Sequence, residues 1–290
     1  MKKVVLLAVA AMFVFVGCKK DGIYNPKKKI SKITYIYPTY SGIGDNDTTT
    51  EVWKWDKNKL KQIVHYSWVE NFVYDKNGRL LRIENIDYDE YIWFEYEGNK
   101  LKKASMYDGG TMETTEFDFE YNGKKLSKIT VSYPRYDTDV KKEQNQLLSA
   151  IFEPAIAQIM EDNMARIAES QSTHKGKVAG YTVSFEWSGK NISKMIYDED
   201  GETTTYELTY DDKINPFNGF LELYIEASFG DESDYIYKNK NNIKTITGME
   251  RNKPYTINFD YEYDGNWPVQ ITKIYPGSSE KYISQIEYRK

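Results

Sequence analysis

The feature that most constrains this sequence of 290 residues is a short motif that recurs along most of it. A typical copy has two large apolar residues, usually aromatic, separated by one residue. A polar turn follows, and an aliphatic residue ends the copy five or six positions after the second ring. The copies begin at Trp53, Phe72, Phe94, Phe119, Phe185, Leu208, Tyr235 and Tyr261. Such self-similarity predicts a repeat architecture with one supersecondary unit per copy.

The first limb of each copy alternates between apolar and charged residues. Phe117, Phe119 and Tyr121 fall on one face of an extended chain, and Asp118 and Glu120 fall on the other. A period of two over such a short run predicts a β-strand. Asn-Gly and Asp-Gly pairs follow several of these limbs, and they tolerate the positive φ of tight hairpins. Each copy is therefore predicted to be a β-hairpin.

The second limb has aliphatic residues three positions apart, as in Leu60 and Ile63 or Leu126 and Ile129. This spacing suits a helix, but the segments are too short and too closely bounded by turns. A β-bulge just after the turn places both residues on the aromatic face. The limb also occurs alone near both ends of the repeat region, at 28–38 and at 283–286.

These units predict an all-β fold: an antiparallel hairpin-repeat meander of about 16–18 strands that forms a barrel-like or rolled sheet. The chain has 26 Tyr, 12 Phe and 6 Trp, residues that β-sheets favour. A porin turns its apolar face to lipid. Here the opposite face of the strands is dense in Lys, Glu and Asp, so the aromatic face is expected to point inward and the charged face outward.

One segment, 139–170, interrupts the repeat. Its apolar residues, among them Leu147, Ile151, Ile156 and Ile159, recur at spacings of three and four. This pattern predicts an amphipathic helical insertion, interrupted at Pro154, which lacks the amide needed to continue a helix. The helix either fills a hollow barrel or binds a partner, and the sequence leaves both readings open.

The N-terminus has the pattern of a bacterial secretory signal. Two lysines precede an uncharged apolar run, 4–16, that is too short to span a bilayer as a helix. The run ends at Gly17 and Cys18, the only cysteine of the chain. This junction resembles a lipobox, which implies a signal peptide over 1–18, a lipid on Cys18 and a basic tether over 19–29. The alternative is an ordinary signal followed by an incidental cysteine.

The phrase Tyr74-Asp-Lys-Asn-Gly-Arg-Leu80 resembles a YD-type (RHS-like) repeat. With its lipobox, the chain resembles Bacteroidetes envelope lipoproteins of unknown function with a porin-like fold. The likeness covers residues 30–290, and the phrase from Tyr210 to Phe217 is its most family-like part. The resemblance implies one repeat domain over 30–290, and it carries no catalytic or binding residue. By the sorting rules of such lipoproteins, Lys19 after Cys18 implies the outer membrane.

Residues that mark catalytic, metal or cofactor sites are scarce. His65 and His174 are the only histidines and neither has a ligand at metal-site spacing, so no metal is expected. No phosphate loop, dinucleotide fingerprint or nucleophile elbow occurs, so neither a cofactor nor catalysis is predicted. The candidate site is an aromatic pair: Trp93, at a position where six of the eight copies carry a polar residue, and Tyr91 beside it on the same outward face. Packing against the tether or a loop is the alternative role for this pair.

The net charge of −5, with both signs interspersed, argues against nucleic acid as a partner. The expected function is therefore a non-catalytic binding module of the cell envelope. It would be held to the membrane by the lipid and would bind a glycan, a peptide or an envelope protein. A structural or adhesive surface scaffold is the alternative, and a hydrolase is the third reading.

Overall fold

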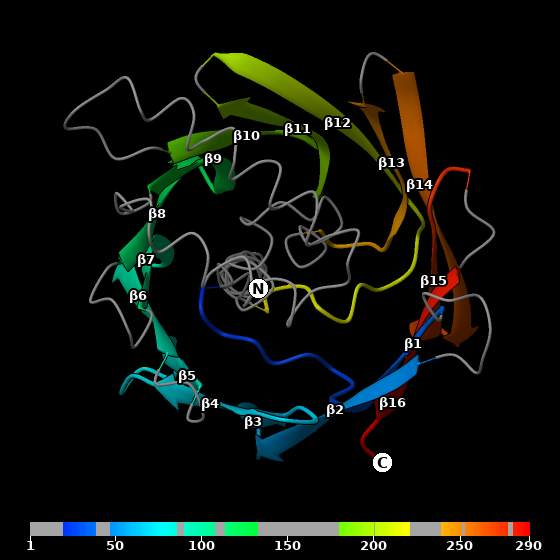
Figure 1. Cartoon of the computed structure of the whole chain (residues 1–290). Coiled ribbons are helices and arrows are strands. Elements are labelled where there is room, and N and C mark those ends of the chain that lie inside the picture. The colour runs from blue at the N-terminus through cyan, green and yellow to red at the C-terminus, as the bar shows by residue number, and fades with distance from the viewer. Residues whose placement is uncertain are drawn as a thin grey trace, which may run out of the picture.

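The computed structural model describes residues 20–38, 47–85, 90–107, 114–132, 180–199, 201–220, 239–250, 253–277 and 281–290. Sixteen antiparallel strands form one closed barrel in which each strand pairs with the next (Figure 1). They are β1 (Ile30–Tyr37), β2 (Asp47–Asp56), β3 (Lys59–Val64), β4 (Val69–Tyr74), β5 (Leu80–Asn85), β6 (Glu90–Glu97), β7 (Lys100–Tyr107), β8 (Thr114–Asn122), β9 (Lys125–Ser132), β10 (Gly180–Ser188), β11 (Asn191–Glu199), β12 (Glu202–Tyr210), β13 (Ile243–Glu250), β14 (Lys253–Asp264), β15 (Trp267–Ile274) and β16 (Lys281–Tyr288). The predicted helical insertion at 139–170 lies outside the described residues.

The barrel closes between the two lone limbs at the ends of the repeat region. β1 pairs with β16, and Ile33 lies opposite Ile286 on the buried face. Each of these strands has only one sequence neighbour to pair with, β2 for β1 and β15 for β16, so each would otherwise be a sheet edge with unpaired backbone groups. Closure removes both edges. The predicted antiparallel meander is confirmed, and the sheet is a closed barrel.

The aromatic face points inward and the charged face outward, as the alternation predicts. Phe117 and Phe119 are buried in the core. On the outer face, Lys128 pairs with Glu120 at 2.9 Å and Lys103 pairs with Glu116 at 2.8 Å across neighbouring strands. Such exposed pairs contribute little to stability, but they place polar groups where the wall of the barrel meets water.

The predicted bulge is present after the tight turns. Trp55 pairs with Leu60 while Lys54 pairs with Gln62, so Lys61 is the extra residue of its strand. Because of this extra residue, Leu60 and Ile63 both point inward, where they are almost completely buried. The same irregularity recurs in the hairpins β4–β5, β6–β7, β8–β9, β10–β11 and β14–β15.

The bulges explain why the motif ends its first limb on a ring with a polar atom. Tyr74 donates its hydroxyl to the Leu60 carbonyl at 2.8 Å, and Tyr96 donates to the Leu80 carbonyl at 2.6 Å. The same bond joins Trp55 to Ile30, Trp187 to Leu126, Tyr210 to Ile192, Tyr261 to Ile243 and Tyr288 to Pro268. A bulge disrupts the ladder, and an unsatisfied buried carbonyl costs about 1–3 kcal/mol. We call this ring of bonds the aromatic–carbonyl belt.

Limbs of the sixth and seventh predicted copies pair with each other, a pairing that the repeat did not predict. β12, the first limb of the sixth copy, pairs directly with β13, the second limb of the seventh, and Tyr210 lies opposite Ile243. The connection between them is long, and asparagines fix its two ends together. Asn215 and Asn218 both donate to the Asn239 carbonyl at 2.9 Å. Both limbs match the repeat, so the local pattern could not reveal that one hairpin uses limbs from two copies.

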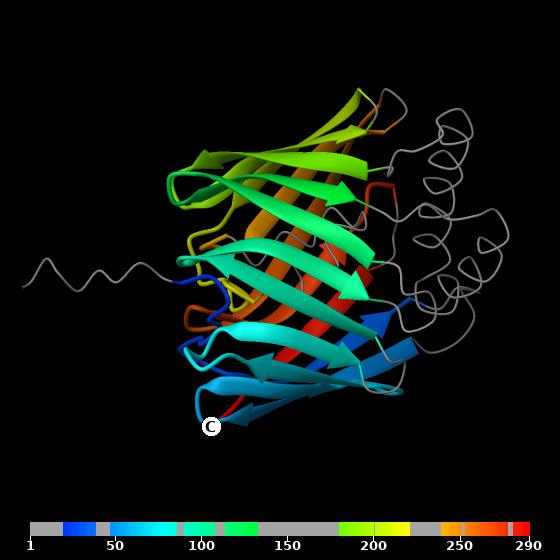
Figure 2. The ribbon, with the colours of Figure 1, turned by 90° about the vertical axis from the view of Figure 1, so that its left-hand side faces the viewer.

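The two ends of the barrel differ. The tight turns and the C-terminus lie at one end, the closed end, and the strand ends that face away from them form the other, the loop end (Figure 2). The carbonyls of the belt directly follow the tight turns, so the belt also lies at the closed end. Residues 20–29, predicted to be a tether, pack across the closed end together with 211–220. There Gly22 accepts a bond from the Leu80 amide at 2.8 Å, and Tyr24 is buried. The segment thus makes specific contacts with the barrel from Asp21 onward.

Candidate functional site

The predicted aromatic pair lies on the outer wall of the barrel. Tyr91 and Trp93 are on β6, on the face opposite Ile92 and Phe94, which pack into the core. Tyr91 stacks on Tyr107 of β7, with ring centroids 4.4 Å apart and an interplanar angle of 20°. The outward orientation expected from the sequence is therefore present, and Tyr107 is an additional ring that the repeat pattern did not indicate.

Arg82 of β5 joins these rings into one surface. Its guanidinium lies 5.6 Å from the centroid of Tyr91 and 5.7 Å from that of Trp93. One terminal nitrogen contacts the carboxylate of Glu84. Its Nε is buried and has no hydrogen-bond partner among the described residues. We call Arg82, Tyr91, Trp93 and Tyr107 the wall patch; elsewhere the outer wall carries cross-strand ion pairs.

Inside the barrel, His65 lies between two carboxylates. Its Nε2 is 3.2 Å from Glu70 and its Nδ1 is 3.5 Å from Glu51. The imidazole also stacks on Trp68 at a centroid distance of 4.5 Å. Burial raises the pKa of the Glu51 carboxyl, and the nearby His65 opposes that shift. The sequence did not reveal this cluster because three neighbouring strands bring it together, although an inward His on a β-limb was a usable signal.

Tyrosine rings line much of the inner wall toward the loop end. One series contacts ring to ring along β10, β11, β12 and β14, and a second runs along β15, β16 and β1. The first comprises Tyr181, Tyr197, Tyr206 and Tyr255, and the second comprises Tyr275, Tyr282, Tyr37 and Tyr35. Gly248 lies beneath the first series, where an added Cβ would come within 2.6 Å of Tyr206 and 3.2 Å of Tyr255. Close ring packing therefore requires a glycine there.

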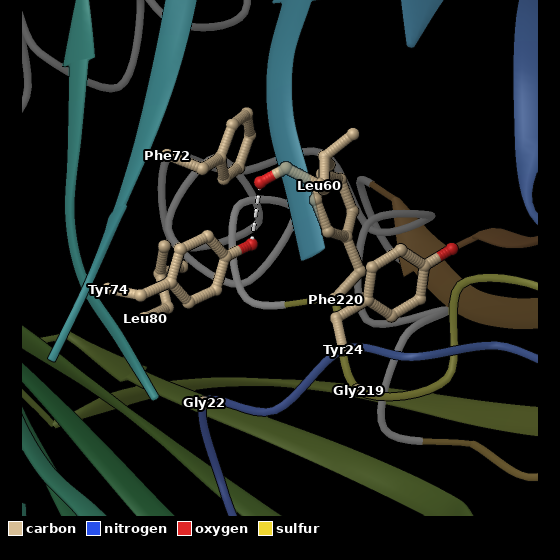
Figure 3. Close-up of a pocket in the computed structure, with 8 residues that line it drawn as sticks. All are labelled: Gly22, Tyr24, Leu60, Phe72, Tyr74, Leu80, Gly219 and Phe220. Atoms are coloured by element: carbon tan, nitrogen blue, oxygen red, sulfur yellow. Dashed lines mark hydrogen bonds between the residues drawn. The ribbon is translucent and has the colours of Figure 1, made fainter. Parts of the chain in front are cut away.

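Among the described residues, aromatic side chains from several segments pack closely in the interior of the closed end. Figure 3 shows Phe72, Tyr74, Tyr24 and Phe220 converging on a small space beside Gly22. Its volume is about 10 Å³, which is room for about one water molecule. Tyr24 also contacts Trp53 and Trp55 and donates its hydroxyl to the Pro216 carbonyl at 2.8 Å. The rings around this space therefore stabilise the barrel, and the space itself is too small for a ligand.

The outer edge of the closed end is rich in positive charge. Its tight turns, entering segment and C-terminus carry Lys20, Lys27, Lys28, Lys29, Lys57, Lys59, Lys76, Arg79, Lys100, Lys124, Lys125, Lys190, Lys213, Lys240, Arg289 and Lys290, which we call the basic rim. The acidic residues of the same end are fewer: Asp21, Asp56, Asp75, Glu97, Asp211, Asp212 and Asp264. An open hollow of about 950 Å³ lies at this edge beside Asp21, and residues of both signs line it.

Other predicted features stay predictions or concern the undescribed part of the chain. Cys18 and His174 lie outside the described residues. Among the residues that the structure describes, no group of three His, Cys, Asp or Glu side chains could hold a metal ion. Within the same residues, no helix is long and apolar enough to cross a membrane.

The comparisons with known proteins support the fold. No protein-family model matches the sequence, and no curated protein matches it. A porin-like protein from Bacteroides uniformis has a TM-score of 0.55 at 11% identity, over 90% of this chain and 98% of that chain. A porin-like protein from Bacteroides vulgatus has a TM-score of 0.53 at 10% identity, over 91% of this chain and 99% of that chain. The protein therefore has a porin-like fold.

Proposed function

We propose that this protein is a lipid-anchored, non-catalytic binding module of the cell envelope that holds a protein partner on its wall patch. The observation that carries the proposal is the wall patch itself, in which Arg82 lies within 6 Å of the ring centroids of Tyr91 and Trp93. Trp, Tyr and Arg are the residue types that dominate the binding energy of protein interfaces.

The shape of the surface favours a protein over a small ligand. Small-molecule sites are concave, whereas the outer wall of a closed barrel is convex. A protein can cover a convex wall, and its acceptors can reach the side chain of Arg82, which is 35% exposed. The two rings supply rigid contact area at a low cost in side-chain entropy.

The anchor and the location belong to the same proposal. Gly17 and Cys18, after the apolar run, support a signal peptide that ends in a lipobox, and the YD-type repeats suit an envelope lipoprotein. Metabolic labelling with a palmitate analogue should tag the natural protein and leave Cys18→Ser untagged. Equal labelling of the two would remove the anchor. The outer membrane is the proposed location.

The patch is tested by affinity capture from the envelope fraction, followed by reconstitution with the purified partner. Trp93→Ala and Arg82→Ala should each weaken binding by about tenfold or more, the cost of losing an interface anchor. Tyr66→Ala is the matched control, because Tyr66 is 93% exposed on the turn between β3 and β4, away from the patch. Unchanged binding by both patch variants would exclude the patch as the interface.

A surface scaffold is the alternative function, and the same experiment separates it from binding. A scaffold predicts that the patch variants capture the same proteins as the natural chain. A glycan array on the same variants tests the second ligand class: a glycan retained by the natural protein and lost by Trp93→Ala would replace the protein partner.

A further inference from the structure

The lipid anchor of the proposed function and the basic rim occur at the same end of the molecule. Asp21 is fixed there by three bonds: its amide donates to the Asn99 carbonyl at 3.0 Å, and its carboxylate accepts from Tyr121 at 2.8 Å and from the Leu101 amide at 3.1 Å. Cys18 precedes Asp21 by three residues. Because an extended residue spans at most about 3.6 Å, a lipid on Cys18 begins within about 11 Å of the closed end.

The positive charge of this end contrasts with the rest of the chain. The whole chain has a net charge of −5, although basic residues outnumber acidic ones at the closed end. The excess of negative charge therefore lies elsewhere in the chain. Two ion pairs, Asp75 with Arg79 at 2.9 Å and Asp264 with Lys28 at 2.8 Å, each engage one acidic and one basic residue, so they leave the excess of positive charge at this end unchanged. Lys57, Lys124 and Lys190 are exposed on three separate turns.

We infer that the basic rim rests on the anionic headgroups of the membrane that holds the lipid anchor, so that the loop end points away from this membrane. This inference rests on the proposed function, since it takes the lipid on Cys18 as given.

The arrangement of the rim lysines favours a planar anionic membrane surface over other polyanions as the binding partner. The tight turns of a barrel end at one level, so the lysines at their tips form a ring of point charges around a flat end. A planar layer of phosphates can meet the whole ring at once, and each lysine near an anionic surface improves binding by about fivefold. Nucleic-acid binders combine a basic groove with stacking rings. Here the rings next to the rim are engaged in the aromatic–carbonyl belt.

The orientation gives the wall patch and the loop end distinct positions. The strands rise from the rim, so the loop end would be the part of the molecule farthest from the membrane. The wall patch lies on the side of the barrel, where it would remain free for a partner while the rim is occupied. Anchoring and binding would then use separate surfaces.

The test is an amine-reactive footprint of the lipidated full-length chain, bound to vesicles that contain anionic lipid or only zwitterionic lipid. Three exposed rim lysines, Lys27, Lys76 and Lys240, report on the closed end, and Lys281 at the loop end is the reference. On anionic vesicles at low salt, the reporters should react about fivefold more slowly than in detergent, while Lys281 should not change. Zwitterionic vesicles should not protect the reporters, because these vesicles carry no net negative charge. A salt concentration of 1 M should remove the protection on anionic vesicles, because screening shortens the range of electrostatic interactions to about 3 Å.

A charge-matched pair of triple variants isolates the rim. Lys57→Gln, Lys124→Gln and Lys190→Gln remove three rim charges, and the reporters should lose most of their protection. Lys54→Gln, Lys103→Gln and Lys194→Gln remove the same charge from the wall and should leave the protection intact. Equal reactivity of the reporters and Lys281 on every vesicle would overturn the inference, as would equal protection by soluble DNA.

The outcomes also separate this inference from the proposed anchor. A chain that floats with vesicles through its lipid, but whose rim lysines stay reactive, keeps the anchor and loses the orientation. A chain that carries no lipid and does not float with zwitterionic vesicles loses the anchor, and rim protection on anionic vesicles then decides whether the rim binds on its own.

Discussion

The closed end and the loop end of the barrel use the same residue, tyrosine, in two different ways. At the closed end most of the motif's rings place their polar atom on a backbone carbonyl, as Tyr74 does with Leu60 and Tyr96 does with Leu80. Toward the loop end the rings contact one another, as Tyr197 and Tyr206 do at a centroid distance of 5.5 Å. The closed-end bonds have fixed direction and recur with the motif. The loop-end contacts depend on which strands happen to be neighbours.

This contrast has a simple cause in the chain. The closed-end rings belong to the motif, because the turn that makes the bulge also presents the carbonyl that the next hairpin needs. The loop-end rings lie outside the motif, at positions where its copies differ. The repeated motif therefore determines the ring contacts of the closed end, and the residues in which the copies differ determine those of the loop end.

The largest expected effect is alkaline unfolding that begins at the closed end. Burial raises the pKa of Tyr24, Tyr96, Tyr121, Tyr210 and Tyr261 above the ordinary value of 10.0. Unfolded tyrosines ionise near pH 10 while these stay protonated in the folded state, so their stabilisation is complete below about pH 10 and is lost as the pH rises further. Absorbance at 295 nm and far-UV circular dichroism should change together in an alkaline titration.

Separate transitions would weaken the comparison. Full ionisation of all tyrosines before the strands unfold would contradict the buried belt. Tyr96→Phe should shift the alkaline midpoint upward, and Tyr282→Phe at the loop end serves as its reference.

The next largest effect concerns the segment that fills the closed end. Tyr24→Ala removes a buried ring that contacts Phe220 at 5.0 Å, and it should cost about 3–5 kcal/mol of unfolding free energy. Tyr37→Ala removes a half-buried ring at the loop end, next to Tyr35, and should cost about 1–2 kcal/mol. Urea denaturation of both variants measures the difference. Equal losses would show that residues 20–29 contribute no more than a loop-end contact.

Two glycine substitutions, one at each end of the barrel, should each lower the stability by a smaller amount, and they do so through different mechanisms. Gly123 has a φ of +60° on a tight turn, with nothing within 4 Å of an added Cβ, so Gly123→Ala should cost about 1–2 kcal/mol through backbone strain alone. Gly248→Ala should cost about 1–3 kcal/mol because its Cβ collides with tyrosine rings.

Asparagine distinguishes these two causes. It tolerates a positive φ, so Gly123→Asn should recover most of the stability lost in Gly123→Ala. Gly248→Asn should be worse than Gly248→Ala, since its side chain is larger. Thermal melts of the four variants suffice, and recovery at both positions would show that the loop-end rings are loosely packed.

The smallest effect belongs to the cations that cover the belt. Lys59 lies 5.1 Å from the ring centroid of Tyr74. Lys59→Met keeps the length of the side chain and removes the charge, so it should cost about 0.5–1 kcal/mol, the usual strength of an exposed cation–π contact. Lys54→Met on the outer wall should cost less. Equal small losses in chemical denaturation would mean that the cation adds nothing to the belt.

The sequence predicted those features whose causes are local. The alternation around Phe119 specifies a strand and its inward face, Asn-Gly pairs mark the turns, and the spacing of Leu60 and Ile63 requires a bulge. Each of these depends on a few adjacent residues, so one copy of the motif is enough to read it. The outward positions of Tyr91 and Trp93 followed from the same alternation.

Only the tertiary structure decided the features that depend on residues distant in the chain. The sequence contains both lone limbs, but nothing local indicates that Ile33 and Ile286 meet to close the barrel. No period indicates that β12 pairs with β13 across the long connection, or that His65 lies between Glu51 and Glu70. The entry of Tyr24 into the closed end belongs here too, because the polar segment 19–29, with its five lysines, resembles a free tether. Such contacts arise when a wide barrel must fill its interior and pair its last edges, and these requirements exist only for the whole fold.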